Sequence, residues 1–371
     1  MRGSIIVLLT LVLGAASARA ATMTNDDIIT LTKKLVGEDG KLSAEAQDLI
    51  IKSINTSDCR FDVSTEQKVK LIDAKVPVRI IDLMIDAQKE WRNKIKAAVQ
   101  VALQGFKDND SKQAERSLRE LTLLGPDAIP EIDKQGLTSD SAPVRAGAIA
   151  AIGQIAHRDG LEPAFRMLVD RESEVRAAAA KALRSVAEDR EKACARLTEM
   201  MGSLEQPRDG AVLALGHLKD LRAAAEIRKL TDSANAPLLR RAAVTALGLM
   251  KDKDSLKLLI ECLLPEKPGS YNIDVSSAAA VSLAHIGDPQ AISALIKAFE
   301  RYPQESARLV GPLSSFHDRR VVETLIDALD HTDTKTSDFA LEALKRLTGS
   351  EMPKNKTDWR NWWDLDGNKR F

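Results

Sequence analysis

Side chains that could catalyse a reaction or hold a metal are few in this sequence, and they are dispersed. None of the five histidines belongs to an H-E-x-x-H zinc motif; they are His157, His217, His285, His317 and His331. The glycine patterns of nucleotide-binding loops and the G-x-S-x-G nucleophile motif do not occur either. Acidic residues are abundant but spread as on solvated helix faces. The sequence therefore predicts no catalytic residue, no metal site and no cofactor.

Three cysteines are the other candidates for reactivity. Cys194 and Cys262 lie in apolar helical patterns, which favours small buried core residues. Cys59 lies in a predicted loop beside Arg60 and Asp62, where a reactive thiol is one interpretation. No partner histidine for Cys59 is recognisable, so we place no catalysis on it.

Composition indicates an all-helical protein and argues against nucleic-acid binding. The 371 residues include 54 Lys and Arg against 54 Asp and Glu, and only 4% are aromatic. A phosphate-binding surface needs clustered excess base, which a neutral chain does not indicate. Ala and Leu carry the apolar content, and both are strong helix formers.

Residues 1–20 have the pattern of a secretory signal peptide. Arg2 precedes an apolar run at 5–13, and Ala18, Arg19 and Ala20 form an A-x-A cleavage site. The run is too short to cross about 30 Å of hydrocarbon as a stable helix. We therefore expect cleavage after Ala20, no membrane span after cleavage, and an exported protein that is periplasmic or secreted.

A repeat of about 31 residues organises the middle of the chain. Its template is an apolar residue at position 0, Ala at +4 and +7, Leu or Ile at +8, and an apolar residue at +11, all on one helix face. Between these helices lie second apolar helices, and one such hairpin cannot bury its own face. The sequence thus predicts a stacked α-solenoid. The repeats begin at residues 113, 144, 175, 207, 239, 275, 305 and 336.

The repeat resembles HEAT repeats, particularly the short bacterial class first noted in phycobilisome lyases. The matching signature is a polar turn followed by an apolar residue, Arg, two residues and Ala, as in Val144-Arg145, Val175-Arg176 and Leu239-Arg240. The resemblance covers 111–350 and implies a right-handed superhelix of about eight two-helix repeats. The class hosts scaffolds, adaptors and a few enzymes. The adjacent His-Glu pairs of the iron-binding HEAT-repeat hydroxylases are absent from the sequence, which removes that assignment.

Arginines recur at position +1 of four repeats, where stacking would place them in a row. One interpretation is a basic stripe for an anionic ligand. The other, which the family resemblance implies, is a structural ladder of arginine–aspartate pairs, because the planar guanidinium fork suits a carboxylate or a carbonyl. The arginines are Arg145, Arg176, Arg208 and Arg240, with Asp140, Asp170 and Asp209 as candidate partners.

Two departures from the repeat carry information. The spacing from 239 to 275 has an excess of about five residues, around a Pro- and Gly-containing segment at 265–272 that includes Tyr271. This insertion is either a partner-contact loop or neutral drift. Pro312 replaces Ala at +7 of the 305 repeat, which predicts a kinked or shortened helix.

The two ends do not follow the repeat. Residues 21–87 read as an N-terminal helical module with capped helix starts at Thr24 and Ser64. Residues 88–110 read as a connecting helix whose apolar seam packs either on the chain's own repeats or on a partner helix. Residues 351–371 hold Trp359, Trp362 and Trp363, which form either a cap over the last repeat or an aromatic ligand platform.

These features favour a non-catalytic extracytoplasmic scaffold or adaptor that binds a protein or peptide on its solenoid surface. Possible partner contacts are Tyr271, Trp359, Trp362 and Trp363. A lyase-like or chromophore-handling factor is an alternative by family resemblance, and binding of cell wall or polysaccharide through the tryptophans is another. Accessible tryptophans would favour the polysaccharide binder, whereas buried ones would favour the scaffold.

Overall fold

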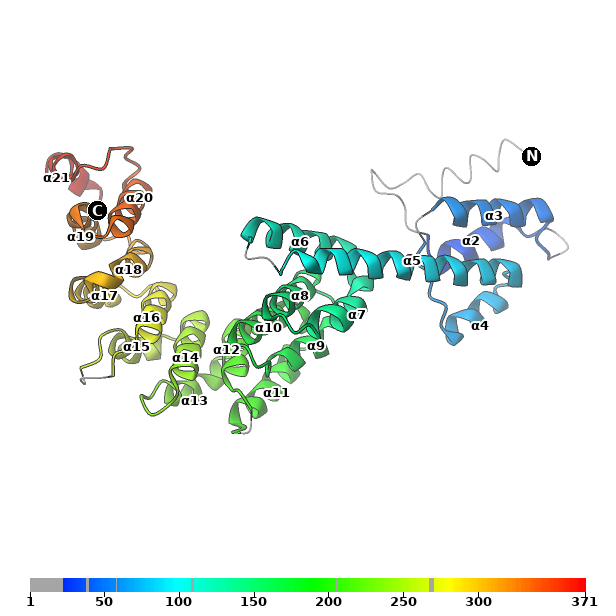
Figure 1. Ribbon diagram of the computed structural model, residues 1–371, viewed down its shortest axis with the longest axis horizontal. Helices are drawn as coiled ribbons and strands as arrows, with labels where there is room; N and C mark the ends of the chain where they lie inside the picture. The colour runs from blue at the N-terminus through cyan, green and yellow to red at the C-terminus, as the bar shows by residue number, and fades with distance from the viewer. Residues whose placement is uncertain (1–22, 38–39, 58, 108–109, 205, 267–269) are drawn as a thin grey trace. The chain divides into compact units, whose positions relative to one another are not determined.

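The computed structural model describes residues 23–37, 40–57, 59–107, 110–204, 206–266 and 270–371 (Figure 1). The expected signal peptide at 1–20 lies outside the described residues. The chain divides into two compact units, 1–102 and 103–371, and each is described by itself. Within the described residues β structure is limited to two isolated bridges, Met23–Cys59 and Val36–Leu42. None of the described helices has the length and apolar character needed to cross a membrane.

Among its described residues, the first unit has four helices around a small apolar core. They are α2 (Asn25–Leu35), α3 (Ala44–Thr56), α4 (Thr65–Asp73) and α5 (Val78–Gln104). Thr24 forms a capping box with Asp27, and the Ser64 hydroxyl accepts from the Gln67 N–H, so both expected helix starts are confirmed. Helix α5 continues past residue 87, where the sequence divides a module from a connecting helix, and the compact unit ends at residue 102. The core is formed by Ile28, Ile50, Leu71, Ile80 and Met84.

The second unit is an α-solenoid, as the repeat predicts. Eight helix pairs follow one another in its described residues, and each even-numbered helix carries one of the eight repeat patterns. The pairs are α6 (Ser111–Leu124) with α7 (Ile129–Ile132), α8 (Ala142–Ile155) with α9 (Leu161–Met167), α10 (Ser173–Val186) with α11 (Arg190–Gly202), α12 (Asp209–Leu218) with α13 (Ala224–Lys229), α14 (Pro237–Met250) with α15 (Leu256–Leu263), α16 (Ile273–Ile286) with α17 (Ala291–Arg301), α18 (Ser306–Leu313) with α19 (Arg319–Asp327), and α20 (Thr334–Thr348) with α21 (Lys356–Leu365).

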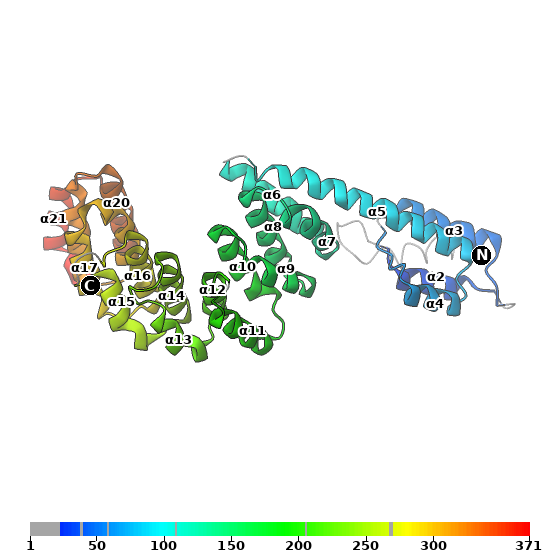
Figure 2. The ribbon, with the colours of Figure 1, turned by 60° about the horizontal axis from the view of Figure 1, so that its bottom comes forward.

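The pairs stack into two layers, because each even-numbered helix packs on the next even-numbered one (Figures 1 and 2). Helix α21 therefore takes the place of the second helix in the eighth pair. Helix α18 has 8 residues, whereas α8, α10, α14 and α16 each have 14. Pro312 lies inside α18, which agrees with the shortening expected at that repeat.

Small residues let the even-numbered helices approach closely. A Cβ built on Gly216 would lie 2.6 Å from the Cα of Ala246, and one built on Gly153 would lie 2.7 Å from the Cβ of Ala182. Ala182 and Ala246 are the buried +7 residues of the next repeats. The repeat's Ala at +7 therefore sets the distance between neighbouring helices.

We predict that Gly216→Ala destabilises the array by about 1–3 kcal/mol, because the added methyl group overpacks a contact between helix backbones. Gly202→Ala is the matched control, since nothing lies within 4 Å of a Cβ at that exposed position, the last residue of α11. The control should change the stability by less than about 0.5 kcal/mol, because the added methyl group meets no neighbour. Urea unfolding followed by circular dichroism measures both, and equal midpoints for the two variants would refute the close approach.

Candidate functional site

The first rung of the arginine ladder joins α8 to the turn before α10. Arg145 donates through Nε and Nη2 to the two carboxylate oxygens of Asp170, at 2.7 and 2.8 Å. Its Nη1 donates to the carbonyls of Ser139 and Asp140, at 2.8 and 3.0 Å. The hydrogen bonds that Arg145 donates to Asp170 raise the pKa of Arg145 against the lowering effect of burial. Burial raises the pKa of Asp170, but the bonds from Arg145 and from the Glu172 N–H outweigh it and hold that pKa below its usual value.

The second rung joins α10 to α12 in the same manner. Arg176 donates through Nε to both carboxylate oxygens of Asp209, each at 2.9 Å, and through Nη1 to the carbonyls of Asp170 and Arg171. Both side chains of this pair are buried. Asp170 thus receives Arg145 on its carboxylate and Arg176 on its carbonyl, and with the Arg176–Asp209 pair the two rungs link three successive repeats.

The other predicted ladder residues do not form such rungs. Asp140 contributes its carbonyl to Arg145, while the carboxylate partner comes from Asp170 in the turn that precedes the next repeat. Arg208 is the N-cap residue of α12, just before the helix, and it forms no ion pair with any described residue. Arg240 donates its Nε to the carbonyl of Thr231 at 3.1 Å and pairs with no carboxylate of the described residues.

In the later repeats serine takes the +1 position, and each hydroxyl is buried and donates to an earlier carbonyl. Ser276 donates to Leu263, Ser306 to Phe299 and Ser337 to Thr334. Arginine at this position, like Ser276 and Ser306, therefore binds carbonyls that the preceding turn or helix end leaves open, whereas Ser337 binds a carbonyl of its own helix.

A groove of about 820 Å³ opens at the edge of the array between α13, α14 and α15. The groove was not predicted from the sequence, although its border includes described residues of the 265–272 insertion. Residues 267–269 of that insertion lie outside the described residues. The groove is lined by Arg228, Lys229, Thr231, Asp232, Ser233, Arg240, Lys257, Leu258, Glu261, Cys262, Pro265, Glu266 and Ser270.

The lining of the groove carries both signs of charge. Arg228 is neutralised by Asp252 at 2.9 Å, and Lys229 by Glu226 at 2.7 Å. Burial raises the pKa of the Cys262 thiol, so this group stays protonated at neutral pH. The arrangement combines hydrogen-bond donors and acceptors with a comparable share of apolar surface, which suits a polypeptide segment.

Tyr271 is attached to the repeats rather than to the groove. Its ring stacks on Tyr302, with the ring centroids 4.3 Å apart. Burial is the main cause of its raised pKa, which a hydrogen bond with Ser276 partly offsets. Tyr271 therefore helps to hold the end of the insertion against the array.

The C-terminal tryptophans, predicted as either a cap over the last repeat or partner contacts, contribute to the core of the array. Trp359 and Trp363 are 0% and 1% exposed, and Trp362 is partly buried against the same cluster. The indole N–H of Trp359 donates to the Pro353 carbonyl at 3.0 Å, and that of Trp363 donates to Glu323 at 3.3 Å. The two buried rings are not accessible to a sugar or a partner, because α21 places them against α19. This burial favours the scaffold over the polysaccharide binder.

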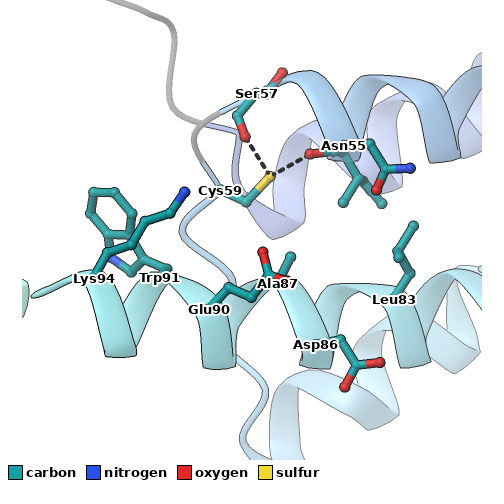
Figure 3. Close-up of a pocket in the computed structure, with 10 residues that line it drawn as sticks. Asn55, Ser57, Cys59, Leu83, Asp86, Ala87, Glu90, Trp91 and Lys94 are labelled. Atoms are coloured by element: carbon teal, nitrogen blue, oxygen red, sulfur yellow. Dashed lines mark hydrogen bonds between the residues drawn. The ribbon is translucent and has the colours of Figure 1, made fainter. Parts of the chain in front are cut away.

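A second cavity, of about 170 Å³, lies in the first unit between α3 and α5 (Figure 3). Cys59 is buried beside it, and its thiol donates to the carbonyls of Ile54 and Ser57, at 3.2 and 3.3 Å. Arg60 lies over the Trp91 ring, 5.4 Å from its centroid. Because the Cys59 thiol is engaged as a donor, the structure gives it a packing role rather than that of an activated thiolate.

Burial shifts the pKa values of two further titratable side chains. Burial lowers the pKa of His217, and the neighbouring Lys181 and Arg184 add to this effect. Burial also raises the pKa of Cys194 to about 11. Among the described residues no group of three or more His, Cys, Asp and Glu side chains is placed to hold a metal ion.

Comparison with known families supports the repeat assignment. The family description "HEAT repeats" matches residues 134–208 and 205–271, and "PBS lyase HEAT-like repeat" matches residues 277–301. No curated protein matches the chain.

Three solved structures are similar in fold. The complex of CpcE and CpcF of phycocyanin lyase from Nostoc sp. PCC7120 has 16% identity and a TM-score of 0.38, covering 67% of this chain and 94% of that one. Human deoxyhypusine hydroxylase in complex with glycerol has 18% identity and a TM-score of 0.31, covering 69% and 98%. An engineered protein has 18% identity and a TM-score of 0.31, covering 86% and 98%. At these TM-scores the three structures carry no argument about function.

Proposed function

Since this chain is a HEAT-repeat protein, we propose that it is a non-catalytic scaffold that binds a protein or peptide segment in the groove between α13, α14 and α15. The proposal rests on the groove, which has a volume of about 820 Å³. The groove lies within the repeat spacing from 239 to 275, the one spacing that an insertion enlarges. Solenoids bind partners on extended surfaces, and insertions in their repeats map to loops that often belong to the binding face.

The non-catalytic part of the proposal rests on how the titratable groups of the array are used. The carboxylates whose pKa values are lowered are held in ion pairs and helix caps, as Asp170 is by Arg145 and Asp318 by Arg320. The match to the lyase repeat family covers one helix pair and describes a fold, so we assign a lyase step to no residue.

We also propose that the protein is exported, on the strength of the charged start, short apolar run and A-x-A site within residues 1–20. N-terminal sequencing of the protein from its native envelope should find a chain that begins at Ala21. A cytoplasmic chain that begins at Met1 would contradict export without affecting the groove.

Site-specific photocrosslinking tests the binding groove. We expect a photoreactive amino acid at Lys257, an exposed groove residue, to capture a discrete partner, whereas one at Lys192 on α11 should not. Ser233→Trp should fill the groove and lower the crosslinked yield about tenfold or more, because a bulky ring occupies the space of the partner. Ser185→Trp, on an exposed position of α10 outside the groove, is the matched control. Equal capture from Lys257 and Lys192, or full capture by the Ser233→Trp protein, would refute the proposal.

A further inference from the structure

Arg240 is a buried arginine of the ladder that has no carboxylate partner in the described part of the chain. It is 8% exposed and lines the groove, and its hydrogen bond runs from Nε to the Thr231 carbonyl. Thr32 Oγ1 and Trp91 Nε1 are the described side-chain atoms that are both buried and unpaired. The Nη1 and Nη2 groups of Arg240 are not among these enclosed atoms and have no hydrogen-bond partner among the described residues, so they remain accessible to solvent in a residue that lines the groove. A largely buried guanidinium whose donors lack acceptors costs free energy, and a bound anion reduces that cost.

The insertion lies where the missing carboxylate would be. Asp170 follows Arg145 by 25 residues, and Asp209 follows Arg176 by 33 residues. From Arg240 the same offsets fall on Pro265 and Ile273, on either end of the 265–272 insertion. Glu266, beside Pro265, lines the groove but forms no ion pair with Arg240, and Asp274, beside Ile273, lies 3.7 Å from Arg308 instead. In the earlier rungs this segment contributes an aspartate. At Arg240 the corresponding segment contains Pro265 and borders the groove instead.

We propose that Arg240 binds a single carboxylate of the partner segment, which completes the open rung of the ladder. This inference rests on the proposed function of the groove and names the chemistry that the groove recognises. With Nε committed to Thr231, the Nη1–Nη2 edge presents two parallel donors, which is the geometry of bidentate carboxylate binding. The partner carboxylate takes the role that Asp170 has for Arg145.

The acids around the groove restrict the ligand further. Asp232, Glu261 and Glu266 share the lining with Arg240, so an extended polyanion would be repelled. A carboxylate flanked by neutral or basic residues satisfies Arg240 and complements these acids. The source of the carboxylate is either an acidic side chain or a chain terminus, and small probes distinguish the two.

Titration of the full chain, labelled with ¹⁵N, tests carboxylate binding directly. The probes are N-acetylglutamate α-amide, which carries a side-chain carboxylate, and N-acetylalanine, which carries a terminal one. We expect the Arg240 Nε–H signal to shift with at least one of them, and the stronger response identifies the source. N-acetylglutamine amide should cause no shift. An equal response to inorganic phosphate, or no response at Arg240 to either carboxylate, would overturn the inference.

Two pairs of variants connect the carboxylate to partner capture. Arg240→Gln should lower the affinity of the responding probe about 10- to 100-fold, as expected for lost hydrogen bonds to a charge, while Arg241→Gln leaves it unchanged. Pro265→Asp supplies an internal carboxylate and should abolish probe binding in a folded protein, whereas Pro265→Asn should not. A partner that still crosslinks at Lys257 in both the Arg240→Gln and Pro265→Asp proteins would overturn this inference and leave the groove's proposed function intact. Loss of capture in the Ser233→Trp protein tests that function separately.

Discussion

Asp209→Ala lowers the free energy of unfolding by about 3–5 kcal/mol, the range for removing one partner of a buried ion pair. The side chains of Arg176 and Asp209 are 5% and 7% exposed. Without Asp209 the Arg176 guanidinium remains inside the protein with only the carbonyls of Asp170 and Arg171 as acceptors. Urea unfolding at neutral pH, followed by circular dichroism, measures the loss.

The control for Asp209→Ala is an ion pair of the same chemistry at the surface. Glu162 pairs with Arg196 at 2.7 Å, and these side chains are 68% and 46% exposed. Solvent screens such pairs, so Glu162→Ala should cost less than about 1 kcal/mol. If both variants unfold at the same urea concentration, the ladder contributes no more than a surface contact and its structural role is refuted.

Trp363→Ala lowers the stability of the C-terminal repeats by about 3–5 kcal/mol, as expected for deleting a fully buried aromatic side chain. Trp363 packs in the core cluster that extends from α14 to α21, and its ring meets Phe371 with centroids 5.4 Å apart. Repeats in a solenoid contact mainly their neighbours, so the damage should stay near this end. We expect an early partial transition on heating, with hydrogen-exchange protection lost in α19–α21 and retained in α8–α12.

Leu365→Ala is the control on the same helix, because this side chain is 74% exposed. It should change the stability by less than about 0.5 kcal/mol. Truncation after Thr348 extends the test, since it exposes the apolar face of the last repeat and should cause association. An unchanged melting curve for Trp363→Ala together with a monomeric truncated protein would contradict the burial of α21.

The sequence by itself determined the helical class, the repeat and its register. These features follow from local rules, because apolar spacing, helix caps and small residues act within one helix or between adjacent ones. The eight repeat patterns each coincide with an even-numbered helix, and the caps at Thr24 and Ser64 are present as expected. The arginines at position +1 were recognised for the same reason.

Pairings between repeats depended on the tertiary structure. The sequence places Asp140 and Asp170 near Arg145, but only stacking decides that the carboxylate comes from Asp170 and the carbonyl from Asp140. Arg240 has the same local pattern as Arg176, yet an insertion more than twenty residues away leaves it facing a groove. The signal that could have shown this was the absence of an acid at Pro265.

The C-terminal tryptophans show the same limit. A cap over the last repeat and an exposed aromatic platform would have the same composition and the same helical spacing. The pattern of Trp359, Trp362 and Trp363 is therefore compatible with both. Their burial is decided by the packing of α21 against α19, which places two of the three rings in the core. Local sequence sets which residues share a helix face, and the neighbouring repeat determines whether that face is covered.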